Sequence, residues 1–113
     1  GTIAFVNLEF DYDKASIRPE SLPLLGQVAE AMRSNPKLVM EIRGHTDDRG
    51  GDDYNQRLSE QRAEAVLEEL VEMGIGRNRL VAKGFGESKP LVENNSDDNR
   101  RKNRRTEFVI IGR

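Results

Sequence analysis

The strongest constraint on the fold is a long helical pattern that lies between two short β-rich runs. Residues 38–43 alternate apolar and polar side chains, as a strand with one buried face does. Residues 54–73 carry apolar side chains at helical spacing, and residues 80–85 form the next β-rich run. A strand–helix–strand unit favours parallel pairing of its two strands through a right-handed crossover. The chain is therefore expected to build a sheet with this helix packed on it.

The remaining segments extend this unit on both sides. The sequence predicts a first strand over residues 3–10 and a helix that opens at Pro19 and ends before Pro36. It predicts a last strand over residues 106–111, reached through an exposed polar loop over residues 93–102. Because no helix precedes this last strand, we expect it to pair antiparallel. The predicted fold class is α+β: a two-layer β-α-β-α-β-β sandwich with a mixed four-stranded sheet and helices packed on one face.

Size and composition limit the possible functions. The 113 residues are expected to form one domain, residues 1–113, excised from a longer protein because the chain begins without Met. Eighteen Lys and Arg residues against twenty Asp and Glu give a formal charge of −2, so no net field favours nucleic acid or an anionic membrane. The chain has no Cys, which excludes disulfides and thiolate chemistry. No apolar run approaches the roughly 20 residues of a membrane-spanning helix, and no cofactor motif is present, so we expect no cofactor.

The most unusual segment is the loop over residues 44–51, which joins the second strand to the long helix. Ligands of open sheets bind at this edge, where strands end and a helix begins. On the helix, Asn55 and Arg62 lie on one line beside the apolar face, and Leu58 lies further round. Asp47 could bind an ammonium group and Arg62 a carboxylate, so together they would recognise a zwitterion such as an amino-acid head group. A plain Asp47–Arg62 salt bridge covered by Leu58 is the alternative.

Catalytic and metal chemistry have weaker signals. His45 could bind a metal beside Asp47, as in a metal-dependent hydrolase, but this only His of the chain has no second ligand at a metal-binding spacing. A His at a strand end is more often a structural, hydrogen-bonded residue. Ser59 and Ser88 have no His-containing frame for nucleophilic catalysis. We therefore predict that the domain is not an enzyme and holds no metal.

The basic tract from Arg100 to Arg105 offers the alternative function, a module that binds nucleic acid or another polyanion. Acidic residues flank the tract, and no aromatic side chains alternate with its basic ones to stack on bases. At the start of a strand, Arg104 and Arg105 would point to opposite faces. One of them could then pair with a carboxylate at the edge of the core, which favours a structural role.

Taken together, the sequence motifs resemble the OmpA-like domain, the peptidoglycan-binding module of outer-membrane protein A, of the peptidoglycan-associated lipoprotein and of the flagellar stator protein MotB. The resemblance covers nearly the whole chain. It rests on these motifs: Phe10-Asp11, Gly44-His45-Thr46-Asp47 with Gly50, Tyr54-Asn55 with Leu58-Ser59 and Arg62-Ala63, Gly74-Ile75, Arg79-Leu80, Gly84-Phe85-Gly86, Pro90 and Asn103-Arg104-Arg105.

The resemblance implies non-covalent binding of the peptidoglycan stem peptide through meso-diaminopimelate. It implies that Asp47 and Arg62 hold the free zwitterionic end of that residue, and that Leu58 contacts the stem peptide. Supporting contacts are implied for Asn55, Asp11, Phe10 and Thr46. The resemblance implies that the Asn-Arg-Arg motif has a structural role and does not bind the ligand.

The resemblance also implies a location and a partner. The domain would anchor an envelope protein to the cell wall, in the periplasm and associated with the outer membrane of a Gram-negative bacterium. It would reach a membrane only through parts of the parent protein that are absent here, and nothing in the sequence indicates an oligomeric state. Two departures, Gly51 where a polar residue is common and Asn99 where Gly is, lie in expected loops and affect loop shape more than the Asp47–Arg62 pair.

Overall fold

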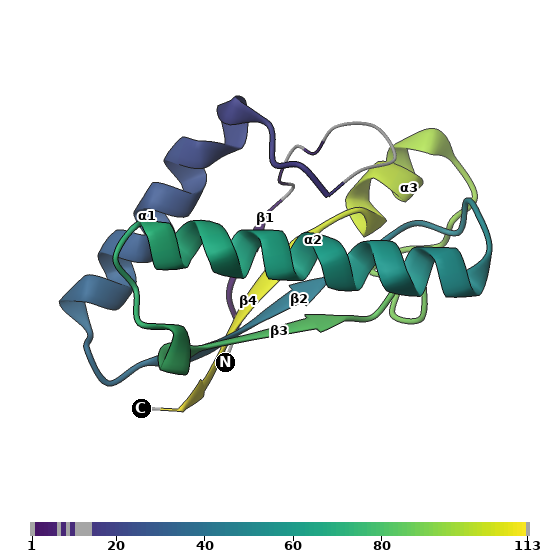
Figure 1. The fold of residues 1–113 in the computed structure, drawn as a ribbon. Helices are drawn as coiled ribbons and strands as arrows, with labels where there is room; N and C mark the ends of the chain where they lie inside the picture. The colour runs from purple at the N-terminus through teal and green to yellow at the C-terminus, as the bar shows by residue number, and fades with distance from the viewer. Residues whose placement is uncertain (1, 7, 9, 11–14, 113) are drawn as a thin grey trace.

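The computed structural model describes the chain except for residues 1, 7, 9, 11–14 and 113 (Figure 1). A short 3-10 helix over Pro19–Ser21 leads into the first α-helix, and another over Arg77–Arg79 leads into the third strand. In chain order the helices and strands are β1 (Thr2–Val6), α1 (Leu22–Ser34), β2 (Val39–Gly44), α2 (Asp52–Glu72), β3 (Leu80–Gly84), α3 (Asp97–Asn103) and β4 (Thr106–Gly112).

The strands form one mixed sheet in the order β1-β4-β2-β3. β2 pairs parallel with β3 through the crossover helix α2, whereas β4 pairs antiparallel with β2 and with β1. The α+β class, the parallel crossover and the antiparallel last strand are confirmed. The first strand is shorter than expected: β1 ends at Val6, and Phe10 makes an isolated bridge with Ile17.

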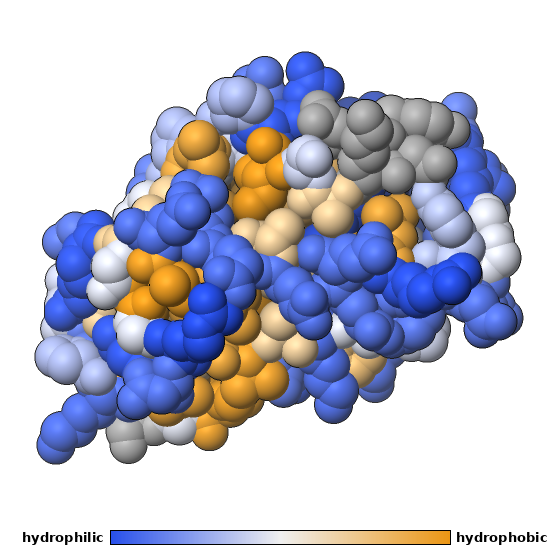
Figure 2. Space-filling view, viewed as in Figure 1, coloured by the Kyte–Doolittle hydropathy of each residue, from blue (hydrophilic) through white to orange (hydrophobic). Residues whose placement is uncertain are grey.

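The core lies between the sheet and the helices, with α2 lying over β2 and β3 and α1 packed beside α2 (Figure 1). Alternation along β2 buries Met40 and Ile42 completely, and Phe108 of β4 faces the same layer. The helices bury the apolar faces that their spacing predicted. Their core residues are Leu25, Ala29, Met32, Ala63, Val66 and Leu70. Figure 2 shows that the helix side of the molecule is otherwise mostly hydrophilic.

Two glycines let α2 lie directly on the ends of β2 and β3. A Cβ added to Gly44 would lie 2.5 Å from the backbone oxygen of Ser59, and one added to Gly84 would lie 2.5 Å from the backbone nitrogen of Glu60. Real Cβ atoms do not approach backbone this closely, so only glycine fits. This close contact brings the middle of α2 next to the loop that follows β2.

The prediction of an exposed loop over residues 93–102 is wrong for the second half of this segment, which forms α3. Ser96 caps this helix by accepting a hydrogen bond from the Asn99 N–H at 3.1 Å. Acidic residues lie in its first turn and basic residues in its last, which suits the helix dipole. Asn103 is fully buried at its end and bonds the preceding loop at Leu91 and Val92. The segment lacks apolar periodicity, so capping and this one buried amide define the helix.

None of the helices in the described part of the chain is both long enough and apolar enough to cross a membrane.

Candidate functional site

The loop between β2 and α2 is held at the edge of the sheet by backbone and side-chain hydrogen bonds. The His45 N–H donates to the Arg105 carbonyl at 3.0 Å, and the Thr46 N–H donates to the Gly86 carbonyl at 2.8 Å. From α2, the buried Asn55 amide donates to the carbonyls of Asp47 at 3.3 Å and Arg49 at 2.8 Å. The loop is therefore bonded to the segment after β3, to the segment before β4 and to the helix, which fixes the position of Asp47.

Asp47 is a buried carboxylate with both oxygens engaged. Its side chain is 8% exposed, and its Oδ2 accepts a hydrogen bond from Arg104 Nη1 at 2.6 Å. Its Oδ1 accepts the N–H of Arg49 at 2.9 Å, and the Thr46 hydroxyl donates to the Asp47 carbonyl at 2.9 Å. The ion partner of Asp47 is thus Arg104, whereas the alternative drawn from the sequence was a salt bridge to Arg62.

Arg62 extends from the middle of α2 toward the same region. Its guanidinium carbon lies 4.7 Å from the centre of the Phe10 ring, which is the geometry of a cation–π contact. Phe10 comes from the segment after β1, so this contact joins the N-terminal part of the chain to α2. A contact of this kind is attractive, by about 0.5–1 kcal/mol at an exposed site, and favours this placement of the guanidinium.

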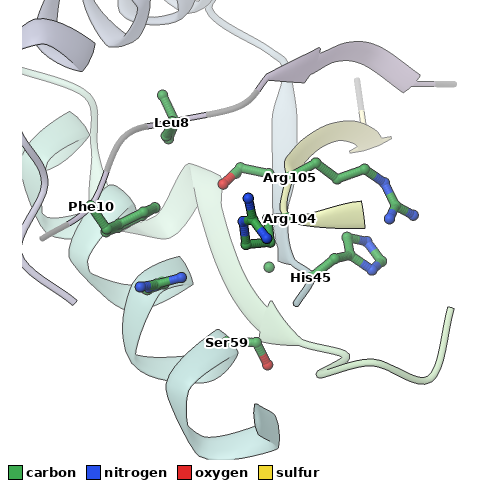
Figure 3. A pocket seen from close by; sticks show the side chains of 9 residues that line it. Leu8, Phe10, His45, Ser59, Arg104 and Arg105 are labelled. Atoms are coloured by element: carbon green, nitrogen blue, oxygen red, sulfur yellow. The ribbon is translucent and has the colours of Figure 1, made fainter. Parts of the chain in front are cut away.

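A pocket lies between these elements, with about 300 Å³ of empty space including its open mouth (Figure 3). In Figure 3, Ser59 comes from α2, Leu8 and Phe10 from the N-terminal segment, and Arg104 and Arg105 from the link between α3 and β4. Its lining residues are Leu8, Phe10, Gly44, His45, Ser59, Arg62, Arg104, Arg105 and Thr106.

The pocket brings together only some of the predicted site residues. Arg62 and Phe10 line it, and Asp47 is bonded to a third lining residue, Arg104. Thr46 and Asn55 support the loop through the hydrogen bonds above, and Leu58 is half-buried on α2. Asp11 lies outside the described residues. The residues that sequence reasoning did not assign to the site include Leu8, Ser59 and Thr106. Leu8 and Thr106 have no local pattern that would mark them, whereas Ser59 lies in the motif that also holds Leu58 and Arg62.

One wall of the pocket is a buried charged cluster. Arg105, with its side chain 5% exposed, donates to Glu107 at 2.8 Å and to the Lys89 carbonyl at 3.0 Å. His45 Nε2 lies 3.3 Å from Glu107 Oε1. The imidazole ring stacks on the Phe85 ring, with 5.3 Å between the ring centroids. Burial lowers the pKa of His45, and the nearby Arg105 lowers it further, so the imidazole is neutral at pH 7. Among the described residues, no three metal-ligating side chains come together.

The basic tract is neutralised by carboxylates. Arg100 pairs with Asp48 at 2.9 Å, and Arg101 pairs with Asp98 at 3.3 Å. Arg104 and Arg105 pair with Asp47 and Glu107, so both, and not one alone, meet a carboxylate at the edge of the core. A phosphate backbone would have to compete with each of these acids, which gives the polyanion alternative no support.

Fold and site together define an α+β domain with a small charged cleft at the ends of its strands. Residues 9–104 match the OmpA family, and the chain belongs to that family. The family is non-enzymatic, so the prediction that the domain is not an enzyme is confirmed by its membership.

Individual relatives agree with this assignment. The chain is 39% identical over 105 residues to outer membrane porin F of Pseudomonas fluorescens, covering 93% of this chain and 32% of the relative. It is 36% identical over 110 residues to the peptidoglycan-binding protein ArfA of Mycobacterium tuberculosis, covering 97% and 32%. The crystal structure of the peptidoglycan-associated lipoprotein from Burkholderia pseudomallei superposes with a TM-score of 0.83 at 34% identity, covering 91% and 87%. The chain thus spans about a third of the length of these two sequence relatives.

Proposed function

We propose that this domain binds peptidoglycan without catalysis, through the zwitterionic end of meso-diaminopimelate in the stem peptide. One observation carries the proposal: Arg62 lines a small pocket in contact with the Phe10 ring, and the buried carboxylate of Asp47 pairs with Arg104, another residue of the pocket lining. The names of two relatives, a peptidoglycan-binding protein and a peptidoglycan-associated lipoprotein, support peptidoglycan as the partner.

The two charges match the two groups of the ligand. The ligand ammonium would donate to the Asp47 carboxylate, and the ligand carboxylate would accept two parallel hydrogen bonds from Arg62. Arg104 and Arg105 already place two positive charges on one wall of the pocket. Because His45 on that wall is neutral, it adds no third charge that would repel the ligand ammonium. Leu58 would contact the stem peptide, and Asp11, Asn55, Thr46 and Phe10 would support the site. Arg62→Lys should bind poorly, since an ammonium cannot form the two-pronged contact.

The role we propose is that of an anchor for a longer envelope protein. The site is small and open to solvent, which suggests a monovalent affinity on the order of 1 μM to 1 mM. The cell wall presents many stem peptides, so several tethered copies would hold it firmly. We propose a periplasmic location associated with the outer membrane. The family also occurs in Mycobacterium, so membership alone does not assign a Gram-negative envelope.

The test is an NMR titration with a stem tetrapeptide that contains meso-diaminopimelate, beside its L-lysine counterpart. We expect saturable shifts around Asp47 and Arg62 with the first peptide and much weaker ones with the second, because lysine lacks the side-chain carboxylate. Arg62→Lys should abolish the difference, whereas the matched control Arg57→Lys, an exposed residue of the same helix, should preserve it. Equal binding of both peptides would rule out the Arg62 contact. Shifts with neither peptide would rule out the wall-binding function.

A further inference from the structure

In the free domain, the Asp47 carboxylate, which the proposed function assigns to the ligand ammonium, already has hydrogen-bond partners. Asp47 Oδ2 is bonded to Arg104 Nη1 at 2.6 Å, and Oδ1 is bonded to the backbone N–H of Arg49 at 2.9 Å. An incoming ammonium must therefore share or replace the Arg104 contact. Arg104 itself lines the pocket, so its guanidinium occupies the side of Asp47 from which a ligand in the pocket would approach.

Arg104 is free to move in a way that its neighbour is not. Its side chain is 43% exposed, and it follows the last residue of α3. Arg105 is 5% exposed and donates to Glu107, to the Asn103 carbonyl and to the Lys89 carbonyl. The Arg104–Asp47 pair can therefore open without disturbing the buried wall of the pocket.

The consequences differ for ligands of different charge. A ligand with only an ammonium group would displace Arg104 and leave that guanidinium without its carboxylate. A ligand with only a carboxylate would meet Arg62 and Arg104 while leaving the Asp47–Arg104 pair closed. A zwitterion supplies both groups: its ammonium takes the place of Arg104 at Asp47, and its carboxylate lies within the same cleft as Arg62 and the released Arg104. Only the zwitterion replaces the salt bridge that it breaks.

We propose that Arg104 is a specificity-determining positioning residue, which holds Asp47 in the free domain and transfers to the carboxylate of the bound zwitterion. This inference rests on the proposed function. It assigns to the first Arg of the Asn-Arg-Arg motif a role in selecting the ligand, beyond the framework role that the resemblance implies. Arg104 is bonded to a residue 57 positions away in sequence, so the pair also joins the site loop to the link between α3 and β4.

The experiment measures the dissociation constants of three stem tetrapeptides by calorimetry. One contains meso-diaminopimelate, one contains L-lysine with the ammonium alone, and one contains L-2-aminopimelate with the side-chain carboxylate alone. We expect Arg104→Gln to lower the preference for diaminopimelate over lysine by about tenfold, because the diaminopimelate carboxylate then loses the released Arg104 guanidinium, whereas the ammonium groups of both ligands bind Asp47 without a competitor. Arg104→Lys keeps the competing charge and should retain most of the preference.

Arg101→Gln is the matched control, since it removes the same charge three residues earlier, within α3, from an exposed pair with Asp98. It should leave the preference unchanged. An unchanged preference in Arg104→Gln, with wild type still selecting diaminopimelate, would overturn the exchange and leave the proposed function intact. Absence of binding to any peptide by the wild type would instead overturn the proposed function. Amide spectra of each variant establish that it is folded. If Arg104→Gln does not fold, Arg104→Lys tests the exchange.

Discussion

Two adjacent arginines face the same pocket and have opposite surroundings. Arg105 is almost fully buried and pairs with Glu107 of the strand that follows it, beside the neutral His45. Arg104 is nearly half exposed and pairs across the molecule with the buried Asp47. The difference shows how one short motif can supply both a fixed wall and a movable charge. The buried pair should control stability, and the half-exposed pair should control binding.

The largest effect is expected from breaking the buried pair. Arg105→Met should lower the free energy of unfolding by about 3–5 kcal/mol, because it leaves the Glu107 carboxylate buried without its partner. Urea unfolding measures this. The control Arg101→Met breaks an exposed pair and should change stability by less than about 1 kcal/mol. Similar losses in both variants would contradict the contrast between the buried wall and the surface.

Breaking the other pair should affect ligand binding instead. Asp47→Asn keeps the size of the side chain but removes the charge that the ligand ammonium requires. We expect it to weaken binding of the diaminopimelate tetrapeptide by about 2–5 kcal/mol. Asp48→Asn changes the next residue, which is exposed and pairs with Arg100, and should bind almost as wild type. Equal weakening in both variants would indicate a general electrostatic effect and would contradict a specific site at Asp47.

The same contrast explains what the sequence could predict. The parallel strand pair, the apolar face of α2 and the loop carrying Asp47 follow from local periodicity and from the order of the elements. Helical spacing also put Arg62 beside the core face, near the loop. The bond from Arg104 to Asp47 has no local signal, since it joins residues that only the completed sheet brings together. The helix α3 was missed because a cap and one buried amide, Asn103, stabilise it without an apolar face.

The close contact of α2 with the strand ends gives a prediction of intermediate size. Gly44→Ala would place a methyl group against the Ser59 backbone, which cannot move away as a flexible side chain can. We expect a loss of about 1–3 kcal/mol in the free energy of unfolding, together with weaker ligand binding as the helix shifts. Gly26→Ala has open space around its new methyl group and lies within α1, so it should stabilise the domain by about 0.5–1 kcal/mol. An unchanged free energy of unfolding in Gly44→Ala would mean that α2 does not need to lie this close to the end of β2.

The smallest effect concerns the neutral imidazole of the buried wall. Burial and Arg105 lower the pKa of His45 in the folded state, while Glu107 opposes the shift and Arg43 adds to it. The unfolded chain therefore binds a proton at higher pH than the folded one, so stability falls as the pH drops below about 6.5. One proton limits the slope to about 1.4 kcal/mol per pH unit.

Denaturant unfolding between pH 7 and pH 5 should show this slope in wild type and a flatter profile in His45→Gln, which lacks the only His of the chain. A stability that rises toward pH 5 would mean that Glu107 dominates and that the imidazole is charged in the wall. Arg105→Met should move His45 in that direction, because it removes one of the cations that depress its pKa and leaves Glu107 in place.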